Sequence, residues 1–301
     1  MRKQIEEFLN ALRVEKGYAH NTIVAYHNDL EQFVQFLTEH LGNTSWQQVT
    51  KADLIAYVNS LKEEREYASA TVARKIAATK SFFHHLCQRG ILKEDPSATL
   101  DSPKVRKYLP TAISQEEVVR LLQAPAQHET VRSLRDVALL ELLYATGMRV
   151  SELVSLDVAD LDLERGCVRC SNRGGRNKER TIPIYRRAVE VLGRYLSDSR
   201  PKLVHDDREP ALFLNHRGHR LTRQGLWLII KKYVEEVGIE TPVTPHTLRH
   251  SFATHLLSGG ADVREVQGLL GHANISTTQV YTQLNPEKLR EAYDEAHPRA
   301  R

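Results

Sequence analysis

The stretch TPHTLRHSFATHLLSGG, residues 244–260, predicts a helix with a marked beginning and a marked end. Thr244 is a typical N-cap, and Pro245 suits the first helical turn, where its missing amide hydrogen is not needed. The pair Gly259–Gly260 indicates where the helix stops. This segment is therefore expected to form one helix that packs its apolar residues against a core.

The first turn of this predicted helix carries three residues that can bear positive charge. His246, Arg249 and His250 occupy neighbouring positions, because residues three or four apart share a face of a helix. A helix N-terminus itself carries partial positive charge, which disfavours a protonated histidine there. This concentration of cationic groups predicts a negatively charged partner close to the turn.

The composition is that of a soluble globular protein with one large domain or two ordinary ones. The chain has 301 residues, of which 41% are hydrophobic and 27% are charged. No apolar run approaches the roughly 18 residues of a membrane span, and the N-terminal 17 residues lack the apolar region of a secretory signal. Three scattered cysteines do not indicate a disulfide framework, which favours the reducing cytoplasm.

Two segments of the chain are strongly basic, although the net charge is only +4. Residues 67–93 contain no acid, and residues 165–187 contain a single one, Glu179. One basic run is most often a solvated surface, but two in one chain favour a polyanionic partner. The basic residues are Arg74, Lys75, Lys80, Arg89 and Lys93 in the first run, and Arg165, Arg169, Arg173, Arg176, Lys178, Arg180, Arg186 and Arg187 in the second.

The first hundred residues predict helices only, and these are expected to form a small bundle. Helical apolar spacing occurs at residues 4–15, 22–40, 53–64 and 69–88. Residues 95–111 carry three prolines and no apolar periodicity, which indicates a linker.

The remainder of the chain predicts helices around a single hairpin. Ser114 and Glu117 have the spacing of a capping box, and Cys167–Ile184 resembles two short strands joined by the turn-prone SNRGGRN. Further helices are expected at residues 134–145, 187–196, 222–237, 245–257, 262–270, 276–282 and 286–296. The predicted fold is thus mainly α with a small antiparallel β-hairpin, divided into a helical domain at residues 1–95, a linker at 96–111 and a mixed domain at 112–301.

Several chemistries are excluded by missing residues. The chain has no GxxxxGK[ST] loop for a nucleotide triphosphate, and Thr247 stands where a zinc-protease helix needs glutamate between its histidines. Cys167 and Cys170 would point to opposite faces of a strand, and no second cysteine pair follows. No cluster of carboxylates suits two-metal chemistry. We therefore expect neither a metal site nor a cofactor.

Three further residues are candidates for a functional site because of the glycines and predicted helices around them. Arg149 follows a helix-ending glycine, His272 follows another, and Tyr281 falls in a short predicted helix. Taken singly, each has an ordinary structural explanation: an ion pair between Arg149 and Glu152, a histidine in a loop, and a tyrosine in the core.

Taken together, these groups suit cleavage of a phosphodiester without a metal. Two guanidinium groups can hold the non-bridging oxygens of one phosphate and offset the charge that develops in the transition state. A tyrosine hydroxyl can attack the phosphorus, with nearby histidines handling protons. The resulting phosphotyrosine conserves the bond energy, so the strand can be rejoined without ATP.

Three blocks of the sequence closely resemble those of tyrosine recombinases, specifically the bacterial Xer family. They are ATGMRVSEL at 145–153, TPHTLRHSFATHLL at 244–257 and LLGHANISTTQVYT at 269–282. The resemblance extends to GYAHNTIVAYHNDLEQFVQFL near the N-terminus and to the final AHPRA. The details QVYT and YDEAHPRA are more similar to the XerC branch than to the XerD branch.

The resemblance implies a role for each matching residue. Arg149 and Arg249 would bind the scissile phosphate, and His246 would act as the general acid–base group. His272 would donate a hydrogen bond to the phosphate, and Tyr281 would be the nucleophile that becomes linked to the 3′-phosphate. His250 would be structural.

The resemblance also implies partners. The chain would bind double-stranded DNA at a specific site with a SAM-like core-binding domain at 1–95 and a catalytic domain at 112–301. Expected DNA contacts are Arg74, Lys75, Lys80, Arg173, Arg176 and Arg180. The active assembly would be a homo- or hetero-tetramer with itself or a second Xer-type recombinase, with a septal DNA translocase as a further partner and no membrane contact. The implied function is resolution of chromosome and plasmid dimers during segregation and cell division.

One segment departs from the family pattern. Family members carry a catalytic lysine in a hairpin turn similar to GKGNKER, whereas this chain has SNRGGRNKER, with Gly175 where that lysine should stand. Arginine is a poor proton donor, because its pKa lies above about 12. We hypothesise that Lys178 is recruited by a shifted turn, or that protonation of the leaving group is weakened.

Three other functions share parts of this pattern. A DNA-binding partner with weakened catalysis would account for the missing lysine. A type IB topoisomerase uses the same chemistry to relax supercoils, and a phage or transposon integrase uses it to insert DNA.

Overall fold

The computed structural model describes residues 1–40, 42, 45–101, 103, 112–171, 179–271 and 286–300. The chain divides into two compact units, unit 1 at Met1–Tyr108 and unit 2 at Leu109–Arg301. No helix in the described ranges is both long enough and apolar enough to cross a membrane.

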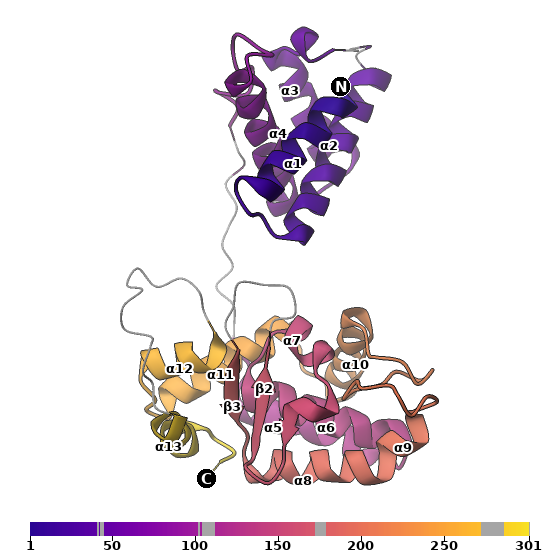
Figure 1. Ribbon diagram of the computed structural model, residues 1–301, viewed down its shortest axis with the longest axis vertical. Helices are drawn as coiled ribbons and strands as arrows, with labels where there is room; N and C mark the ends of the chain where they lie inside the picture. Colours follow the sequence, from indigo (N-terminus) through magenta and orange to yellow (C-terminus); the bar gives the residue numbers. More distant parts are fainter. Residues whose placement is uncertain are drawn as a thin grey trace. The chain divides into compact units, whose positions relative to one another are not determined.

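Unit 1 is a bundle of four helices around an aromatic core (Figure 1). Its helices are α1 Arg2–Val14, α2 His20–His40, α3 Lys51–Asn59 and α4 Ser69–Gln88, with a 3₁₀ turn at Trp46–Gln48 and a π-helical turn at Ser60–Glu64. Phe33, Trp46 and Phe83 pack their rings against one another in the centre. Such ring pairs bury large apolar areas, which explains why a unit of this size can hold a core.

The segment that follows α4 packs on the bundle as far as Leu100. The side chain of Leu100 joins the apolar core of unit 1, and Lys80 donates a hydrogen bond to its carbonyl oxygen at 3.0 Å. The Asp95 carboxylate accepts hydrogen bonds from the backbone and hydroxyl of Ser97. The first residues of the expected linker are therefore part of the folded unit.

Unit 2 is built around α6, which is buried along most of its length. The helices of unit 2 are α5 Gln115–Gln123, α6 Val131–Thr146, α7 Val150–Ser155, α8 Arg186–Arg194, α9 Arg200–Leu203, α10 Arg223–Glu236, α11 Pro245–Ser258, α12 Val263–Leu270 and α13 Pro286–Ala296. Short 3₁₀ or π-helical segments occur at Ala124–Gln127, Val158–Asp160 and Tyr195–Ser199. The expected helix at residues 276–282 lies outside the described residues.

A three-stranded antiparallel sheet covers one side of this helical core. Its strands are β1 Leu161–Asp162, β2 Cys167–Cys170 and β3 Arg180–Pro183, in the order β1-β2-β3. Val168 pairs with Ile182, and Cys170 pairs with Arg180. Because side chains alternate between the faces of a strand, Arg180 points to the same inner face as the buried Ile182. The expected hairpin is present, the two-residue strand β1 was not anticipated, and the connecting turn lies outside the described residues.

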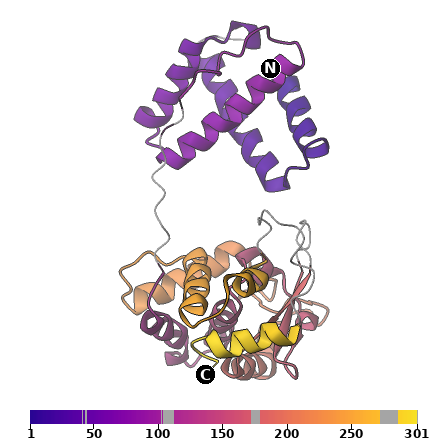
Figure 2. The same cartoon turned by 90° about the vertical axis from the view of Figure 1, so that its left-hand side faces the viewer.

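Helix ends in unit 2 follow the capping residues in the sequence. Thr244 accepts a hydrogen bond from the backbone of Thr247 at the start of α11, and Ser114 and Glu117 form a capping box at the start of α5. Gly147 ends α6 in the left-handed conformation, with φ of 54°. Helix α13 packs against α11 and α12, which brings the C-terminal tail onto the helical core (Figure 2).

Candidate active site

Arg249 lies on α11 and is almost fully buried, with 6% of the residue exposed. Its Nη1 donates to the carbonyl oxygen of Gly147 at 2.7 Å, and its Nη2 donates to that of Leu270 at 2.8 Å. The guanidinium thus joins the end of α6 to the end of α12. A buried charge needs such partners, because an isolated one would be strongly destabilising.

Arg149 is the N-cap of α7 and stands two residues after Gly147. Its backbone amide donates to Glu152 at 2.7 Å, and its Nη1 lies 3.2 Å from the Glu152 Oε1. Its Nη2 donates to the carbonyl oxygen of Gly271 at 3.3 Å. The side chain of Arg149 remains 37% exposed. The ion pair between Arg149 and Glu152 is therefore formed, and the Arg149 side chain is still partly open to solvent.

Arg180 completes the cluster from strand β3. Its Nη1 and Nη2 each lie 3.0 Å from a different carboxylate oxygen of Glu152, which makes a bidentate ion pair. Its Nε donates to the carbonyl oxygen of Leu269 at 2.8 Å. The expectation that Arg180 contacts DNA directly is not favoured by this geometry, because each of its nitrogen atoms already donates to the protein.

The three guanidinium groups converge on the C-terminal end of α12. The acceptors are three consecutive carbonyl oxygens, Leu269 for Arg180, Leu270 for Arg249 and Gly271 for Arg149. The last carbonyl oxygens of a helix lack partners within the helix and carry partial negative charge, so cations stabilise them. Figure 1 shows α12 close to β3, which Arg180 joins through the carbonyl oxygen of Leu269. We call Arg149, Glu152, Arg180 and Arg249 the arginine cluster.

The charges of the cluster shift the proton affinities of its members. Burial, and then the charge of Arg149, lower the pKa of Arg249 to about 10. Burial by itself raises the pKa of Glu152, but hydrogen bonds from Arg180 and from the Arg149 backbone outweigh it and hold this pKa below its usual value. Glu152 is therefore a carboxylate, and three guanidinium groups surround one negative charge. An additional anion is electrostatically favoured here.

His246 is exposed in the first turn of α11, and Arg249 follows it on the next turn. His250 is partly buried on the same helix. His246 and Arg249 are three residues apart and therefore share a face of α11. Imidazole is the side chain most often used to transfer protons near neutral pH.

The remaining expected catalytic residues lie outside the described residues. These are His272, Tyr281 and Lys178, together with Arg173 and Arg176 of the expected DNA contacts. His272 follows directly on Gly271, whose carbonyl oxygen accepts from Arg149. The described part of unit 2 therefore reaches the arginine cluster at Gly271, one residue before His272.

The expected DNA contacts in unit 1 differ in their access to solvent. Lys75 is buried, and its ammonium group binds Asp29 at 2.8 Å and also Gln32. Lys80 is partly buried and holds the carbonyl of Leu100. Arg74 also pairs with Asp29 but keeps 45% of its side chain exposed. Among these, Arg74 is the residue that a phosphate can reach most easily, and Lys75 contributes to the packing of the bundle.

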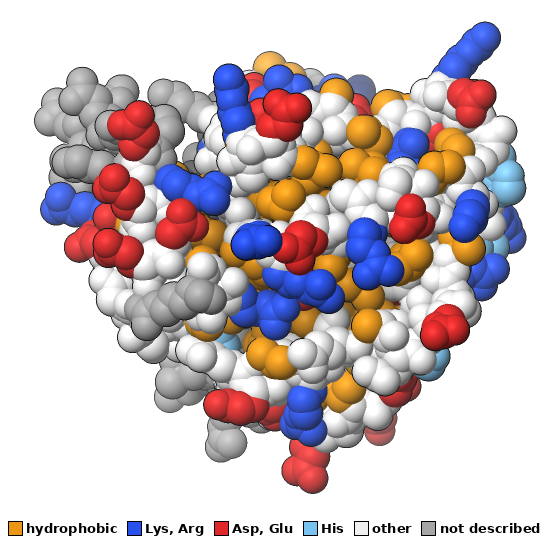
Figure 3. All heavy atoms as spheres, turned by 90° about the horizontal axis from the view of Figure 1, so that it is seen from below, with side chains coloured by type: hydrophobic (Ala, Val, Ile, Leu, Met, Phe, Trp, Pro, Cys, Tyr) orange, Lys and Arg blue, Asp and Glu red, His pale blue; other side chains and the backbone are white. Residues whose placement is uncertain are grey.

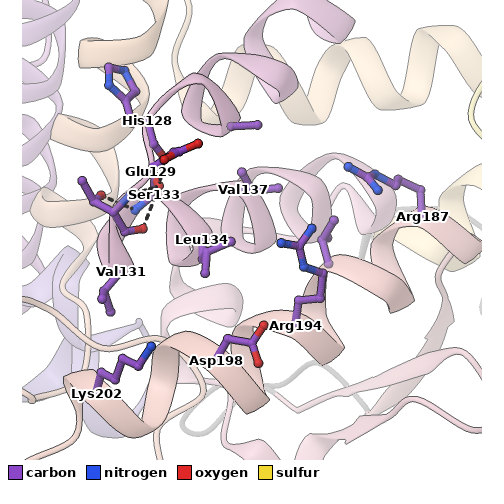
Figure 4. A pocket seen from close by; sticks show the side chains of 13 residues that line it. His128, Glu129, Val131, Ser133, Leu134, Val137, Arg187, Arg194, Asp198 and Lys202 are labelled. Carbon is purple, nitrogen blue, oxygen red and sulfur yellow. Dashed lines mark hydrogen bonds between the residues drawn. The ribbon is translucent and has the colours of Figure 1, made fainter.

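Other surface features of unit 2 lie apart from the cluster. A groove of about 510 Å³ runs between the start of α6 and α8–α9, where Arg187, Arg194 and Lys202 face the apolar side chains of Leu134 and Val137 (Figure 4). It includes none of the expected catalytic residues.

The face shown in Figure 3 carries basic and acidic side chains interspersed with apolar ones, so its charge is not of one sign.

The sequence pointed to Arg149 and Arg249, but not to the ion pair between Glu152 and Arg180 that lies beside Arg149. Glu152 was expected only as a partner of Arg149, and Arg180 only as a DNA contact. The alternation of β3 offered a signal, since it places Arg180 on the same face as Ile182. The helix-end carbonyls could not be predicted, because they come from residues far away in the sequence.

Two family models match the chain. Residues 111–288 match the phage integrase family, and residues 5–90 match the phage integrase N-terminal SAM-like domain.

Curated relatives align over almost the entire chain. The tyrosine recombinase XerC of Herpetosiphon aurantiacus is 52% identical over 99% of this chain and 96% of its own length. The tyrosine recombinase XerD of Oceanobacillus iheyensis is 45% identical over 98% of both chains. The solved structure of the XerH site-specific recombinase, bound to a palindromic difH substrate in a post-cleavage complex, aligns with a TM-score of 0.71 at 24% identity, over 98% of this chain and 84% of that one.

Proposed function

The chain belongs to the phage integrase family and, within it, to the Xer tyrosine recombinases, and from that premise we propose how it acts on DNA. It cuts and rejoins strands at a specific site through a 3′-phosphotyrosine intermediate, and so resolves chromosome and plasmid dimers during segregation and cell division. Similarity to the XerC branch, which the relatives support, favours this role. The reaction takes place in the cytoplasm, where the chromosome lies.

The observation that carries this proposal is the convergence of Arg149 and Arg249 at the end of α12. Both guanidinium groups are held by backbone carbonyl oxygens before any substrate arrives, so little reorganisation is needed when a phosphate binds. Preorganised donors of this kind stabilise the charge that develops in a transition state, and removing one such donor typically costs about 10²–10³ in rate.

The proposed reaction has two steps, cleavage of one strand and its rejoining to another. The Tyr281 hydroxyl attacks the scissile phosphorus, a P–O bond forms to the tyrosine, and the bond to the 5′-oxygen breaks. His246 accepts the tyrosine proton, and the leaving 5′-oxygen takes up a proton to become a hydroxyl group. In the second step, a 5′-hydroxyl of a partner strand attacks the phosphotyrosine and gives its proton to the group that protonated the 5′-oxygen in the first step. The P–O bond to the tyrosine breaks, and His246 returns the proton to the tyrosine oxygen. His272 donates a hydrogen bond to the phosphate in both steps.

The donor of the proton to the 5′-oxygen must differ from the family pattern, because Gly175 occupies the position of the family's lysine. Lys178 is the lysine in the hairpin segment and is proposed to replace it. Arg173 and Arg176, which belong to the turn-prone segment SNRGGRN, are proposed to contact DNA, together with Arg74 of unit 1.

We further propose a synaptic tetramer on DNA, formed with further copies or with a second Xer-type recombinase. A single protomer carries one nucleophile, whereas exchange between two duplexes requires four strand cleavages. A septal DNA translocase is a candidate activator of this assembly.

A covalent-trapping assay tests the proposal. The full chain is incubated with a nicked duplex that carries a candidate chromosomal recombination site, in EDTA and without a nucleotide, and is then run on a denaturing gel. The unaltered chain should form a protein–DNA adduct, and Tyr281→Phe should form none. Specific DNA binding without an adduct, even in the presence of a second Xer-type recombinase, would refute the enzymatic role.

A further inference from the structure

Arg180 connects three elements that meet at the arginine cluster. It begins strand β3, it binds both carboxylate oxygens of Glu152 on α7, and it holds the carbonyl oxygen of Leu269 at the end of α12. Its side chain is 13% exposed. All three contacts come from one planar group, and a lysine could not reproduce them.

Glu152 is placed where it competes with a substrate phosphate for Arg149. The carboxylate is buried, and its nearest approach to the Arg149 guanidinium is 3.2 Å, against 3.0 Å to each of two nitrogen atoms of Arg180. An unpaired buried carboxylate would draw Arg149 into a bidentate pair of its own, because such pairs are the strongest available to a guanidinium group. Arg180 prevents this by occupying both oxygens.

The charge of the cluster depends on the same contact. Arg149, Arg180 and Arg249 carry three positive charges against the single negative charge of Glu152, so the cluster has a net charge of +2. Replacing Arg180 by a neutral residue would leave +1, with the remaining carboxylate directed at Arg149. The loss would also release the Leu269 carbonyl, two residues before the one that Arg149 holds.

A direct role of Arg180 on DNA is less favoured by the contacts. Arg149, which is 37% exposed, offers a phosphate more surface than Arg180, which is 13% exposed. The donors of Arg180 are directed at Glu152 and at the end of α12, into the protein.

We propose that Arg180 is a positioning residue for strand cleavage, an inference that rests on the function proposed above. By holding Glu152 and the end of α12, it keeps the Arg149 guanidinium available to the scissile phosphate. It acts through Arg149 and does not contact the reacting atoms.

The test compares Arg180→Gln, Glu152→Gln and the double variant of the full chain on the nicked duplex described above. The first-order rate of adduct formation is measured at saturating DNA, and the dissociation constant for the same duplex is measured separately. Arg180→Gln should slow adduct formation by at least about tenfold, with DNA affinity changed by less than about threefold. Adding Glu152→Gln should restore at least half of the loss on a logarithmic scale, because the competing charge is gone.

Arg135→Gln is the matched control. Arg135 is buried in the same unit, where it binds the carboxylate of Asp136 and the carbonyl oxygen of Leu214, remote from the cluster. If Arg135→Gln lowers the melting temperature as much as Arg180→Gln does but leaves the rate intact, lost stability does not explain the slower cleavage. If Arg180→Gln fails to fold, Arg180→Lys replaces it and should give the same rescue by Glu152→Gln.

The outcomes separate this inference from the proposed function. An unchanged rate in Arg180→Gln, or a slower rate with weakened DNA binding and no rescue, would overturn the positioning role while the unaltered chain still forms its adduct. Absence of an adduct with the unaltered chain would refute the proposed function, and the inference with it.

Discussion

Arg249 is the residue on which the geometry of the site depends most, because it connects the end of α6 to the end of α12 through two carbonyl oxygens. Its partners occupy part of the guanidinium and fix its plane. The same group is flanked by Arg149, whose positive charge disfavours the charged form of Arg249. A bound anion would relieve this repulsion, which is a physical reason for a phosphate to bind here.

Arg249→Lys should therefore reduce the rate of adduct formation by about 10²–10³. A lysine keeps the charge but cannot hold both carbonyl oxygens and a phosphate at once. The rate is measured on the nicked duplex at saturating DNA. Arg200→Lys is the control, since Arg200 also binds backbone carbonyls, those of Glu209 and Ala211, away from the cluster. Equal losses in the two variants would contradict the role of Arg249.

Lys178→Ala tests the replacement of the family's hairpin lysine. If Lys178 protonates the leaving 5′-oxygen, the variant should cleave about 10²–10⁴ times more slowly, the usual contribution of general acid catalysis. A DNA substrate with a better leaving group in place of the 5′-oxygen, such as a bridging phosphorothiolate, should restore the rate. A normal rate on the unmodified substrate would show that Lys178 has no part in the chemistry.

The residues of the site were predictable from the sequence to different degrees. Arg149 follows the helix-ending Gly147, and Arg249 lies on the helix that Thr244 caps. Such local signals can be read directly from the sequence. Glu152 and Arg180 meet across 28 residues, and only the face of a short strand hinted at their contact. Long-range partners of this kind follow from packing, which no local pattern encodes.

At the scale of elements, the end of α6 controls the approach of α11. Gly147 has a φ of 54°, and a Cβ atom there would lie 2.3 Å from the ring of Phe252. The same glycine presents the carbonyl oxygen that Arg249 binds. A side chain at this position would therefore disturb both the helix end and the arginine cluster.

Gly147→Ala should lower the free energy of unfolding by about 1–3 kcal/mol more than Gly238→Ala does, because overpacking adds to the cost of the left-handed backbone. Gly238 has a similar φ of 65°, but a Cβ atom there meets nothing within 4 Å. Chemical denaturation of the two variants gives the difference. Equal losses of unfolding free energy in the two variants would mean that the left-handed backbone, and not the contact with Phe252, explains why position 147 needs a glycine.

The C-terminal tail carries a buried histidine, His297, whose titration affects stability. His297 is fully buried among the rings of Tyr144, Tyr185, Phe252 and Tyr293. Burial lowers the pKa of His297 to about 3. In the unfolded chain a histidine has a pKa near 6.5, so acid protonates the unfolded state before the folded one.

The stabilising contribution of the neutral His297 is thus fully present above pH 6.5 and is lost as the pH falls toward 3. At pH 4.5 the loss should be of the order of 2–3 kcal/mol. His297→Leu should reduce the pH dependence of unfolding between pH 6.5 and 4.5 by about one proton. Denaturation curves at several pH values measure this. An unchanged slope in the variant would place the acid sensitivity elsewhere, for example at the buried His255, whose pKa is also lowered by burial.

The boundaries of several helices were predicted well from the sequence. Helix α4 spans the expected Ser69–Gln88, and the capping box at Ser114 begins α5. The two-residue strand β1 escaped notice, because two residues are too few to show alternation. The packing of Leu100 on unit 1 was also missed, since the neighbouring prolines suggested a linker throughout.

At the scale of the whole molecule, the count of basic residues overstates the charge available to DNA. Lys75, Lys80 and Arg180 belong to the two basic runs, yet each binds a partner within the protein. Arg74 is more exposed, and Arg173 and Arg176 lie outside the described residues. The sequence therefore predicted the class of partner correctly from charge, but charge alone did not distinguish cations that stabilise the units from those open to solvent.

The central claim is that the arginine cluster serves a tyrosine nucleophile in the same unit. The most direct measurement is to digest the trapped adduct with nuclease and protease and to locate the residual nucleotide by mass spectrometry. We predict that it lies on the peptide that contains Tyr281, attached through the 3′-phosphate, with a free 5′-hydroxyl on the other strand end. A nucleotide on another residue, or attachment through a 5′-phosphate, would contradict the account.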